Sequence, residues 1–309
     1  MHDCMKRRLL YASSQAYQPN PEPPHRRVGW IEPPIVIRRE TGLGHRPIDQ
    51  ALVGRVREGV VIAFRGSLPP LFSGHDGWAV LLDWLNDSLS MCIEDSHYPG
   101  GVHLGFAESM GRLWDDWAGT PGVASAVAAL LERSARDGRA GRHLFLTGHS
   151  KGGALANLAA WRVSAVAPWR DIPISVATIA AARAGNGAFA RAYAATRIAC
   201  LRYEMPSDLV PHLPPGPATP RWLRVLALHF GPRLAASDYH PVGLRVVGRP
   251  LREPWFRAWL SDLWSMIRLR GISVRALTPA ALAAHAIGPQ SGYDRLVCTG
   301  EPRCHHGRS

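Results

Sequence analysis

The pattern G-H-S-K-G at residues 148–152 is the stretch whose residue types and spacing could do chemistry. An apolar run that begins at Leu144 precedes it, and an Ala- and Leu-rich segment follows it. This order predicts a strand, a sharp turn and a helix, with the Ser150 hydroxyl standing clear of the sheet as a nucleophile at the positive end of the helix. Glycines are needed there because strand and helix press together and leave no room for side chains. The alternative is a glycine-rich turn in which the serine only caps the helix.

A serine nucleophile needs a general base, and the base needs a carboxylate that orients it. In serine hydrolases built on such a turn, the acid and then the histidine follow the nucleophile along the chain. Asp208 comes shortly after residues 197–203, which predict a strand. Because catalytic groups of open α/β sheets gather at the carboxyl ends of strands, Asp208 is the candidate acid.

Four downstream histidines could supply the base, namely His212, His229, His240 and His285. His212 stands too near Asp208 in a rigid, Pro-rich turn. His240 immediately precedes a strand-like segment at 244–248. His285 follows a helix-like segment and precedes a loop with Gly and Pro, where it would be free to reach the nucleophile. These observations favour His285 and leave His240 as the alternative.

Residues 59–64 form a continuous apolar run that begins with glycine, as is typical of a strand buried on both faces. The run leads into Gly66 and Ser67, and an apolar, Pro-rich segment follows. The backbone N–H of Ser67 is therefore a candidate donor to an oxyanion, and residues 68–80 are a candidate lid. An ordinary strand-to-helix loop is the alternative.

Apolar runs alternate with helix-like segments along the rest of the chain. We expect a strand at 174–180, and helices at 122–136 and 188–195. Another helix should follow Phe106, with a core-facing stripe formed by Met110, Leu113, Trp114 and Trp117. The alternation predicts an α/β fold in which helices cover both faces of a mainly parallel sheet.

The composition, 46% hydrophobic and 19% charged over 309 residues, is typical of a globular protein. Residues 1–24 end in a Pro-rich stretch and predict an N-terminal arm, followed by a single domain at 25–300 and a tail at 301–309. No apolar run approaches the roughly 18 residues that a membrane span needs, and the N-terminus lacks the apolar core of a secretory signal. We therefore expect a cytoplasmic protein, with signal-independent export as the alternative.

The net charge of +12 favours anionic partners such as a phospholipid surface. Because the arginines are dispersed and no nucleic-acid motif occurs, we expect no nucleic-acid binding. The segment 251–270 combines Trp and Leu with four arginines, so it could lie on an anionic membrane; packing against the core is the alternative. The five scattered cysteines argue against a disulfide framework. Cys304, His305 and His306 offer too few ligands for a metal site.

Together these segments resemble the class 3 lipases, the fungal-type triacylglycerol lipase family of the α/β-hydrolases. The resemblance runs from about Val60 to Tyr293. It is carried by V-I-A-F-R-G-S at 61–67, D-W-L-N-D at 83–87, V-H-L-G-F at 102–106, T-G-H-S-K-G-G-A-L-A at 147–156, R-A-G-N at 183–186 and D-L-V-P-H-L-P-P at 208–215.

The resemblance implies an α/β-hydrolase fold with Ser150 as nucleophile and Asp208 as acid. It also implies an oxyanion hole formed by the backbone N–H groups of Ser67 and Lys151, with the Ser67 hydroxyl as a further contact. The family carries a noncatalytic H-x-G element, which residues 239–243 echo. The resemblance therefore implies that His285 is the catalytic histidine.

The activity implied is hydrolysis of lipid-like carboxylic esters, or of small esters, through an acyl-enzyme, with no metal or organic cofactor. Two alternatives are a lipase fold that binds membranes or a partner protein with little turnover, and an acyltransferase. Nothing in the sequence indicates the oligomeric state.

The chain departs from the family pattern at three places. Ala182 stands where the family usually has proline, and the spacer between His285 and Tyr293 is long. Lys151 replaces an apolar residue and puts a cation at a helix N-terminus, where the helix dipole disfavours it. We expect Lys151 to pair with a carboxylate; an anionic group of the substrate is the alternative partner.

Overall fold

A computed structural model describes residues 1, 3–18, 27–40, 47–67, 91–221, 223–224, 237–248, 285–287 and 291–298. Several sequence-based predictions concern residues outside these ranges. They are the lid at 68–80, the motif at 83–87, the base candidate His229, the amphipathic segment 251–270, and the tail with Cys304, His305 and His306.

A seven-stranded sheet forms the centre of the fold, and its strand order is β1-β2-β3-β6-β7-β9-β11. The pairs β1–β2 and β2–β3 are antiparallel, whereas the pairs from β3 to β11 are all parallel. The strands are β1 (Ile35–Glu40), β2 (Pro47–Val56), β3 (Gly59–Phe64), β6 (Leu144–His149), β7 (Ile174–Ile179), β9 (Ala199–Glu204) and β11 (Leu244–Val247). The mainly parallel sheet predicted from the sequence is confirmed.

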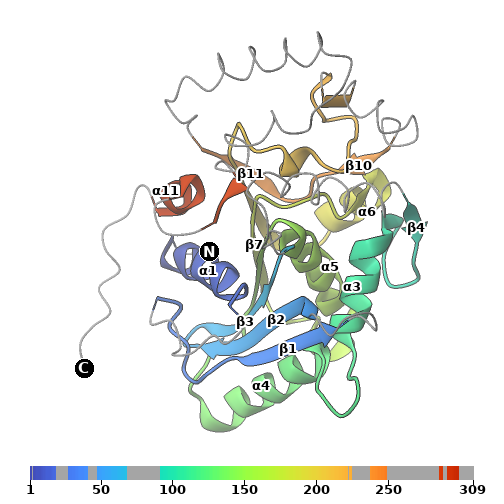
Figure 1. Cartoon of the computed structure of the whole chain (residues 1–309). Helices are drawn as coiled ribbons and strands as arrows, with labels where there is room; N and C mark the ends of the chain where they lie inside the picture. The colour runs from blue at the N-terminus through green and yellow to red at the C-terminus, as the bar shows by residue number, and fades with distance from the viewer. Residues whose placement is uncertain are drawn as a thin grey trace.

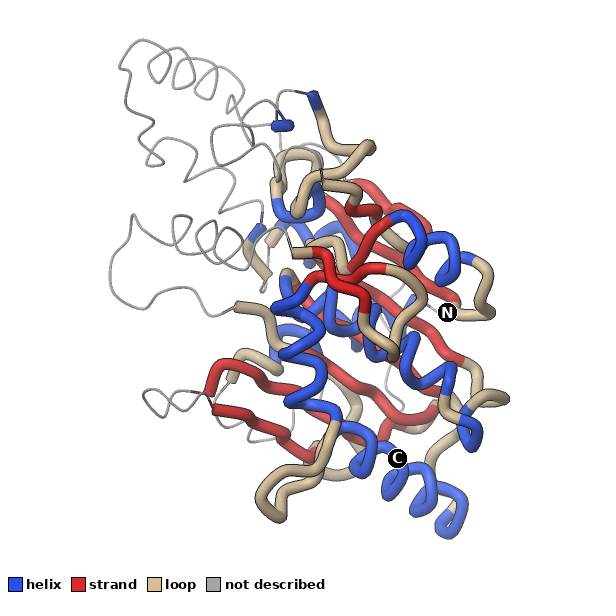
Figure 2. The backbone as a smooth tube through the Cα atoms, turned by 90° about the vertical axis from the view of Figure 1, so that its right-hand side faces the viewer, coloured by secondary structure: helices blue, strands red, loops and turns tan. Residues whose placement is uncertain are grey.

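Helices cover both faces of this sheet (Figure 1). On one face lie α3 (Leu104–Trp114), α4 (Val123–Asp137) and α5 (Lys151–Ala165), which share a large apolar core with the strands. Figure 2 shows these helices in front of the strands. On the other face α1 (Asp3–Gln15) and α11 (Gly292–Cys298) contact each other and enclose a second core. Among the described residues, no helix has the length and apolar character to cross a bilayer.

A small antiparallel sheet flanks the central one. Its strand order is β10-β8-β5-β4, and its strands are β4 (Cys92–Glu94), β5 (Gly101–His103), β8 (Gly185–Asn186) and β10 (Tyr239–His240). Helix α6 (Gly187–Ala194) packs against three of these strands. Two short 3-10 helices, η1 (Ala167–Trp169) and η2 (Val210–His212), complete the elements within the described ranges.

Most predicted elements match the observed ones within a few residues, but the apolar stripe after Phe106 does not extend to Trp117. Helix α3 ends at Trp114, and Trp117 lies in a turn in which its backbone pairs with Thr120. Its side chain is 72% exposed. The prediction that Trp117 belongs to the core is wrong because residues at helical spacing share a face only while the chain is helical, and the helix ends before Trp117.

The first residues of the predicted arm form α1, which packs onto the sheet with Leu9 and Ala12 fully buried. Gln50 on β2 donates hydrogen bonds to the carbonyls of Ala16 and Gln18, at 2.9 and 3.0 Å. Residues 3–18 are therefore part of the packed fold, whereas the Pro-rich stretch 19–24 is not described.

Candidate active site

Ser150 occupies the turn between β6 and α5 and has a strained backbone, with φ 59° and ψ −127°. Such a conformation costs of order 1–3 kcal/mol in a residue that is not glycine, so its surroundings must hold it. The Ser150 N–H donates to the carbonyl of Ile179 at 3.0 Å, and its own carbonyl accepts from the Gly153 N–H at 3.0 Å. The side chain stands at the N-terminus of α5, as the sequence pattern predicts.

The glycines around Ser150 are required by close backbone contacts. A Cβ atom at Gly148 would collide with the carbonyl of Gly152 one turn into the helix. At Gly152 it would collide with the carbonyl of Phe64, where β3 ends. The pressed strand and helix expected from the sequence are therefore observed, and the turn also lies directly against β3.

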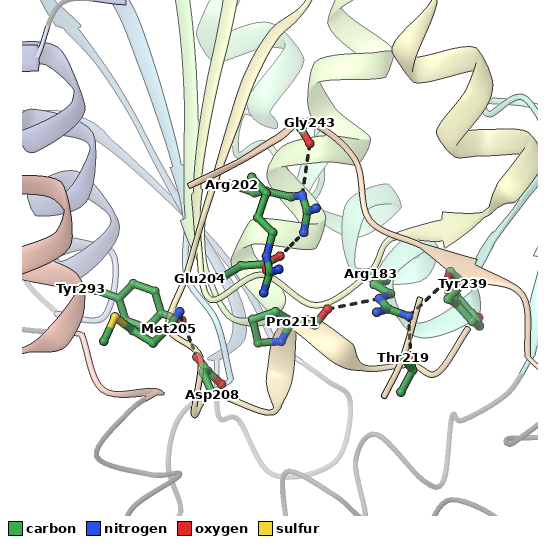
Figure 3. Close-up of polar contacts among 11 residues, drawn as sticks. Arg183, Arg202, Glu204, Met205, Asp208, Pro211, Thr219, Tyr239, Gly243 and Tyr293 are labelled. Carbon is green, nitrogen blue, oxygen red and sulfur yellow. Dashed lines mark hydrogen bonds and ion pairs between the residues drawn. The ribbon is translucent and has the colours of Figure 1, made fainter. Parts of the chain in front are cut away.

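Asp208 is completely buried in the loop after β9 and accepts three hydrogen bonds. Its donors are Nδ1 of His285 at 2.9 Å, the Tyr293 hydroxyl at 2.7 Å and the Val210 N–H at 3.0 Å. Figure 3 shows Tyr293 between Asp208 and the Met205 N–H, which donates to the same hydroxyl at 3.1 Å. The contact with a carboxylate assigns the His285 proton to Nδ1 and leaves Nε2 able to accept one.

His149, the residue before Ser150, fixes the backbone of His285. Its Nε2 lies 2.7 Å from the carbonyl oxygen of His285, and because a carbonyl only accepts, this nitrogen carries the proton. Nδ1 must then accept the hydrogen bond of the Tyr17 hydroxyl, 2.8 Å away. Burial and the neighbouring His285 hold the pKa of His149 well below its ordinary value, so the ring is neutral. A chain of contacts thus runs from Tyr17 to His285.

Arg183 holds the loop that carries Asp208 (Figure 3). Its side chain is buried and donates to the carbonyl of Pro211 at 3.2 Å, to the Thr219 hydroxyl at 2.7 Å and to the carbonyl of Tyr239 at 3.3 Å. Burial lowers the pKa of Arg183 to about 10, so the guanidinium remains charged at neutral pH. These contacts fasten the acid loop to the small antiparallel sheet.

The turn at the end of β3 lies against Ser150. A Cβ atom at Gly66 would approach the Ser150 Cβ to 3.1 Å and the His149 carbonyl to 2.6 Å. The hydroxyl oxygen of Ser67, the next residue, is buried and has no hydrogen-bond partner within the part of the chain that the structure describes. A buried hydroxyl of this kind can donate to a ligand oxygen at the nucleophile.

Lys151, the first residue of α5, pairs with a carboxylate. Its Nζ lies 2.7 Å from Oδ1 of Asp49, a fully buried residue on β2. Arg112 of α3 donates to the other carboxylate oxygen from Nε at 3.0 Å. Burial would raise the pKa of Asp49, but Lys151 and Arg112 outweigh it and the pKa lies below its ordinary value. The expected carboxylate partner of Lys151 is thus present.

The sequence profile of the family "Lipase (class 3)" matches residues 61–217, half of the chain. The chain belongs to the class 3 lipase family. Its activity is accordingly that of a lipase or esterase, a serine hydrolase of lipid esters. No curated protein matches the sequence.

Solved structures of fungal lipases share the fold of this class 3 lipase. A lipase from Rhizopus microsporus var. chinensis is 19% identical with a TM-score of 0.53, over 79% of this chain and 72% of that one. A triacylglycerol lipase from Penicillium expansum is 18% identical with a TM-score of 0.52, over 78% and 77%. The triacylglyceride lipase of Rhizomucor miehei is 20% identical with a TM-score of 0.51, over 79% and 78%. These likenesses confirm the α/β-hydrolase fold.

In this class 3 lipase the structure brings the predicted acid and base together and separates the alternative histidine from them. His285 contacts Asp208, whereas His240 lies on β10 and its Nε2 contacts Asp238 at 2.9 Å. His149, beside Ser150, reaches the backbone of His285. Among the described residues, no group of three or more His, Cys, Asp or Glu could hold a metal ion.

Sequence reasoning assigns no role to Tyr17, Asp49 or Tyr293, which all contact this site. Tyr17 stands in the stretch predicted to be an arm, and Asp49 in a segment whose pattern is ambiguous. Tyr293 stands in the same segment as His285, which is the signal that could have drawn attention to it. Tyr17 and Asp49 carry no local signal.

Proposed function

We propose that this lipase cleaves carboxylic esters of lipid-like acyl groups through an acyl-enzyme on Ser150, with His285 as base and Asp208 as acid. The observation that carries the proposal is the 2.9 Å contact between His285 Nδ1 and Asp208, beside the strained turn of Ser150. It leaves His285 Nε2 as the proton acceptor.

In the first step, His285 Nε2 takes the hydroxyl proton of Ser150 while the serine oxygen attacks the ester carbonyl carbon. Asp208 stabilises the imidazolium that forms. The backbone N–H groups of Ser67 and Lys151, with the Ser67 hydroxyl, donate to the oxyanion; removal of one such donor typically costs about 10²–10³-fold in kcat. The intermediate collapses, and the leaving alcohol takes the proton from His285.

In the second step, water attacks the acyl carbon and gives a proton to His285 Nε2. Collapse of the second intermediate returns that proton to Ser150 and releases the carboxylic acid. The steps are those of hydrolysis and need no metal or organic cofactor.

The test is turnover of a p-nitrophenyl ester series by the wild type and by Ser150→Ala, His285→Ala and His240→Ala. We expect the first two variants to lose at least about a thousandfold in kcat, as removal of a triad member does in other serine hydrolases. His240→Ala serves as the matched control and should keep its turnover. Loss of turnover in folded His240→Ala, with turnover kept in His285→Ala, would refute the assignment of the base.

We also propose that the substrate is presented at an anionic lipid surface, because the chain carries a net charge of +12. The same ester embedded in vesicles should be cleaved faster when the vesicles contain phosphatidylglycerol than when they contain only phosphatidylcholine. The difference should shrink at high salt, since screening weakens the attraction. Equal rates on both vesicles would contradict this part of the proposal.

A further inference from the structure

A buried ionic cluster centred on Asp49 lies behind the turn that carries Ser150. Asp49 accepts from Lys151 and Arg112, and its side chain is fully excluded from solvent. The side chain of Lys151 is itself only 7% exposed. Because burying charges is costly, this cluster exists at an energetic disadvantage that a pair of apolar residues would avoid. The position of the cluster, between β2 and the start of α5, indicates its role.

Asp49, near the start of β2, lies at the same end of the strands as Ser67, which follows the end of β3. Ala51 on β2 pairs with Phe64 on β3, and the Arg65 N–H donates to the carbonyl of Gln50 at 2.9 Å. Continued by one residue beyond Gln50 and Arg65, this register puts Asp49 opposite Gly66, next to Ser67. Lys151, in contrast, begins α5. The ion pair between Asp49 and Lys151 therefore joins α5, whose first residue carries one proposed oxyanion donor, to β2, the strand paired with β3, which leads to the other donor.

We propose that Asp49 is a positioning residue of the oxyanion hole: through its ion pair it holds Lys151 so that the amides of Lys151 and Ser67 point at one oxygen. The inference rests on the function proposed above. The donor is the backbone N–H of Lys151 itself, so a shift of this residue moves the donor with it. A displacement of about 1 Å at a catalytic group can cost about 10²-fold in rate.

The test compares wild type with Asp49→Asn, a variant that keeps the size of the side chain and loses its charge. We expect kcat for a p-nitrophenyl ester to fall about tenfold while KM changes less than threefold, because the donor acts in the transition state. Affinity for an alkyl boronic acid, which bonds to Ser150 and places an oxygen in the oxyanion hole, should fall in parallel.

Glu32→Gln is the matched control. Glu32 is one of two carboxylates that pair with Arg55, a buried arginine near the other end of β2. This variant also leaves a buried cation with a missing partner on the same strand. It should lower the melting temperature but keep the kcat and the boronate affinity of the wild type.

The double variant Asp49→Asn/Lys151→Met removes both charges and keeps the amide of residue 151. Because the buried ammonium of Lys151 is removed together with its partner, we expect kcat and boronate affinity above those of Asp49→Asn but more than twofold below those of the wild type. If Asp49→Asn does not fold, the test rests on the comparison of the double variant with the wild type. Values within twofold of the wild type would then overturn the positioning role.

A purely structural role is also distinguishable. If Asp49→Asn melts earlier but matches Glu32→Gln in kcat and boronate affinity, the inference is overturned. Ser150→Ala in the same assay separates this result from failure of the proposed function. If Ser150→Ala is inactive and Asp49→Asn has the kcat of the wild type, only the positioning role is refuted. If Ser150→Ala is active, the proposed function itself is refuted.

Discussion

At the residue scale, the direction of each hydrogen bond assigns the protons of the site. The His285 carbonyl can only accept, so His149 donates to it from Nε2 and accepts from Tyr17 at Nδ1. The Asp208 carboxylate can only accept while ionised, so His285 donates to it from Nδ1. Both rings are thereby held in one tautomer, and the ring of His285 is held through both its side chain and its backbone.

The variant Tyr17→Phe tests whether this chain of contacts supports turnover. Without the hydroxyl, Nδ1 of His149 loses its donor, and the ring becomes free to exchange its proton or rotate away from His285. The loss of one neutral hydrogen bond is worth about 1 kcal/mol, so we expect kcat to fall roughly fivefold.

Tyr98→Phe provides the comparison for Tyr17→Phe. It removes another largely buried hydroxyl, which accepts from Arg162 at 2.9 Å on the opposite face of the sheet. This variant should lose stability and keep its kcat per folded molecule. Equal kcat in Tyr17→Phe and the wild type would show that His149 holds its orientation without Tyr17.

At the element scale, the strand, turn and helix around Ser150 store strain that the surrounding hydrogen bonds sustain. The positive φ of Ser150 is one of three among the described residues other than glycine; Ala118 and Ala180 have the others. Ala180 follows β7, and its N–H donates to the carbonyl of Tyr203 at 3.0 Å. Two neighbouring parallel strands, β6 and β7, are thus each followed by a residue with a positive φ, at the points where the chain turns sharply away from the sheet.

Replacing Ser150 with glycine or alanine measures the strain in the turn. Both variants lack the proposed nucleophile, but glycine adopts a positive φ without steric cost whereas alanine does not. Glycine removes the backbone strain, and this gain exceeds the cost of its extra conformational entropy in the unfolded chain. Ser150→Gly should therefore be more stable than Ser150→Ala by about 1 kcal/mol. Urea unfolding monitored by circular dichroism gives the difference. A Ser150→Ala variant as stable as Ser150→Gly would mean that the turn relaxes when the hydroxyl is removed.

At the scale of the whole molecule, buried neutral histidines couple the stability of the fold to pH. His103 on β5 is fully buried, stacks on Phe106 with 4.1 Å between ring centroids and faces Tyr239. Burial, with a smaller contribution from the charge of Lys151, lowers its pKa from 6.5 to about 4. His149 is shifted in the same direction.

Stability should therefore fall as the pH drops from about 6.5 towards 4. In that window the unfolded chain takes up protons at these histidines and the folded chain does not, so protons favour unfolding. For His103 alone the loss is about 3 kcal/mol. We expect the free energy of unfolding of His103→Gln to depend less steeply on pH than that of the wild type. Equal slopes in the wild type and in His103→Gln would exclude His103 as a source.

Much of the fold and the core of the site follow from sequence alone. The buried strands and the turn at Ser150 are largely local: continuous apolar runs specify strands covered on both faces, and the collision at Gly148 arises with Gly152, which is close in sequence. The collision at Gly152, in contrast, is with Phe64 on another strand. The pairing of Asp208 with His285 is predictable in kind, because a nucleophile on such a turn needs both partners, and the resemblance to class 3 lipases favours His285 over His240.

Only the tertiary structure decided which distant side chains meet behind the site. Tyr17 and His149 are 132 residues apart, and Asp49 and Lys151 are 102 residues apart. The contact of Asp49 depends on the order β2-β3-β6 and on the register of these strands, and that of Tyr17 depends on the packing of α1 against β6. Apolar periodicity specifies which face of a strand is buried, but it does not specify the neighbouring strand or the residue that lies opposite. The partners of buried polar groups are selected by that arrangement, and they become apparent only when the sheet is assembled.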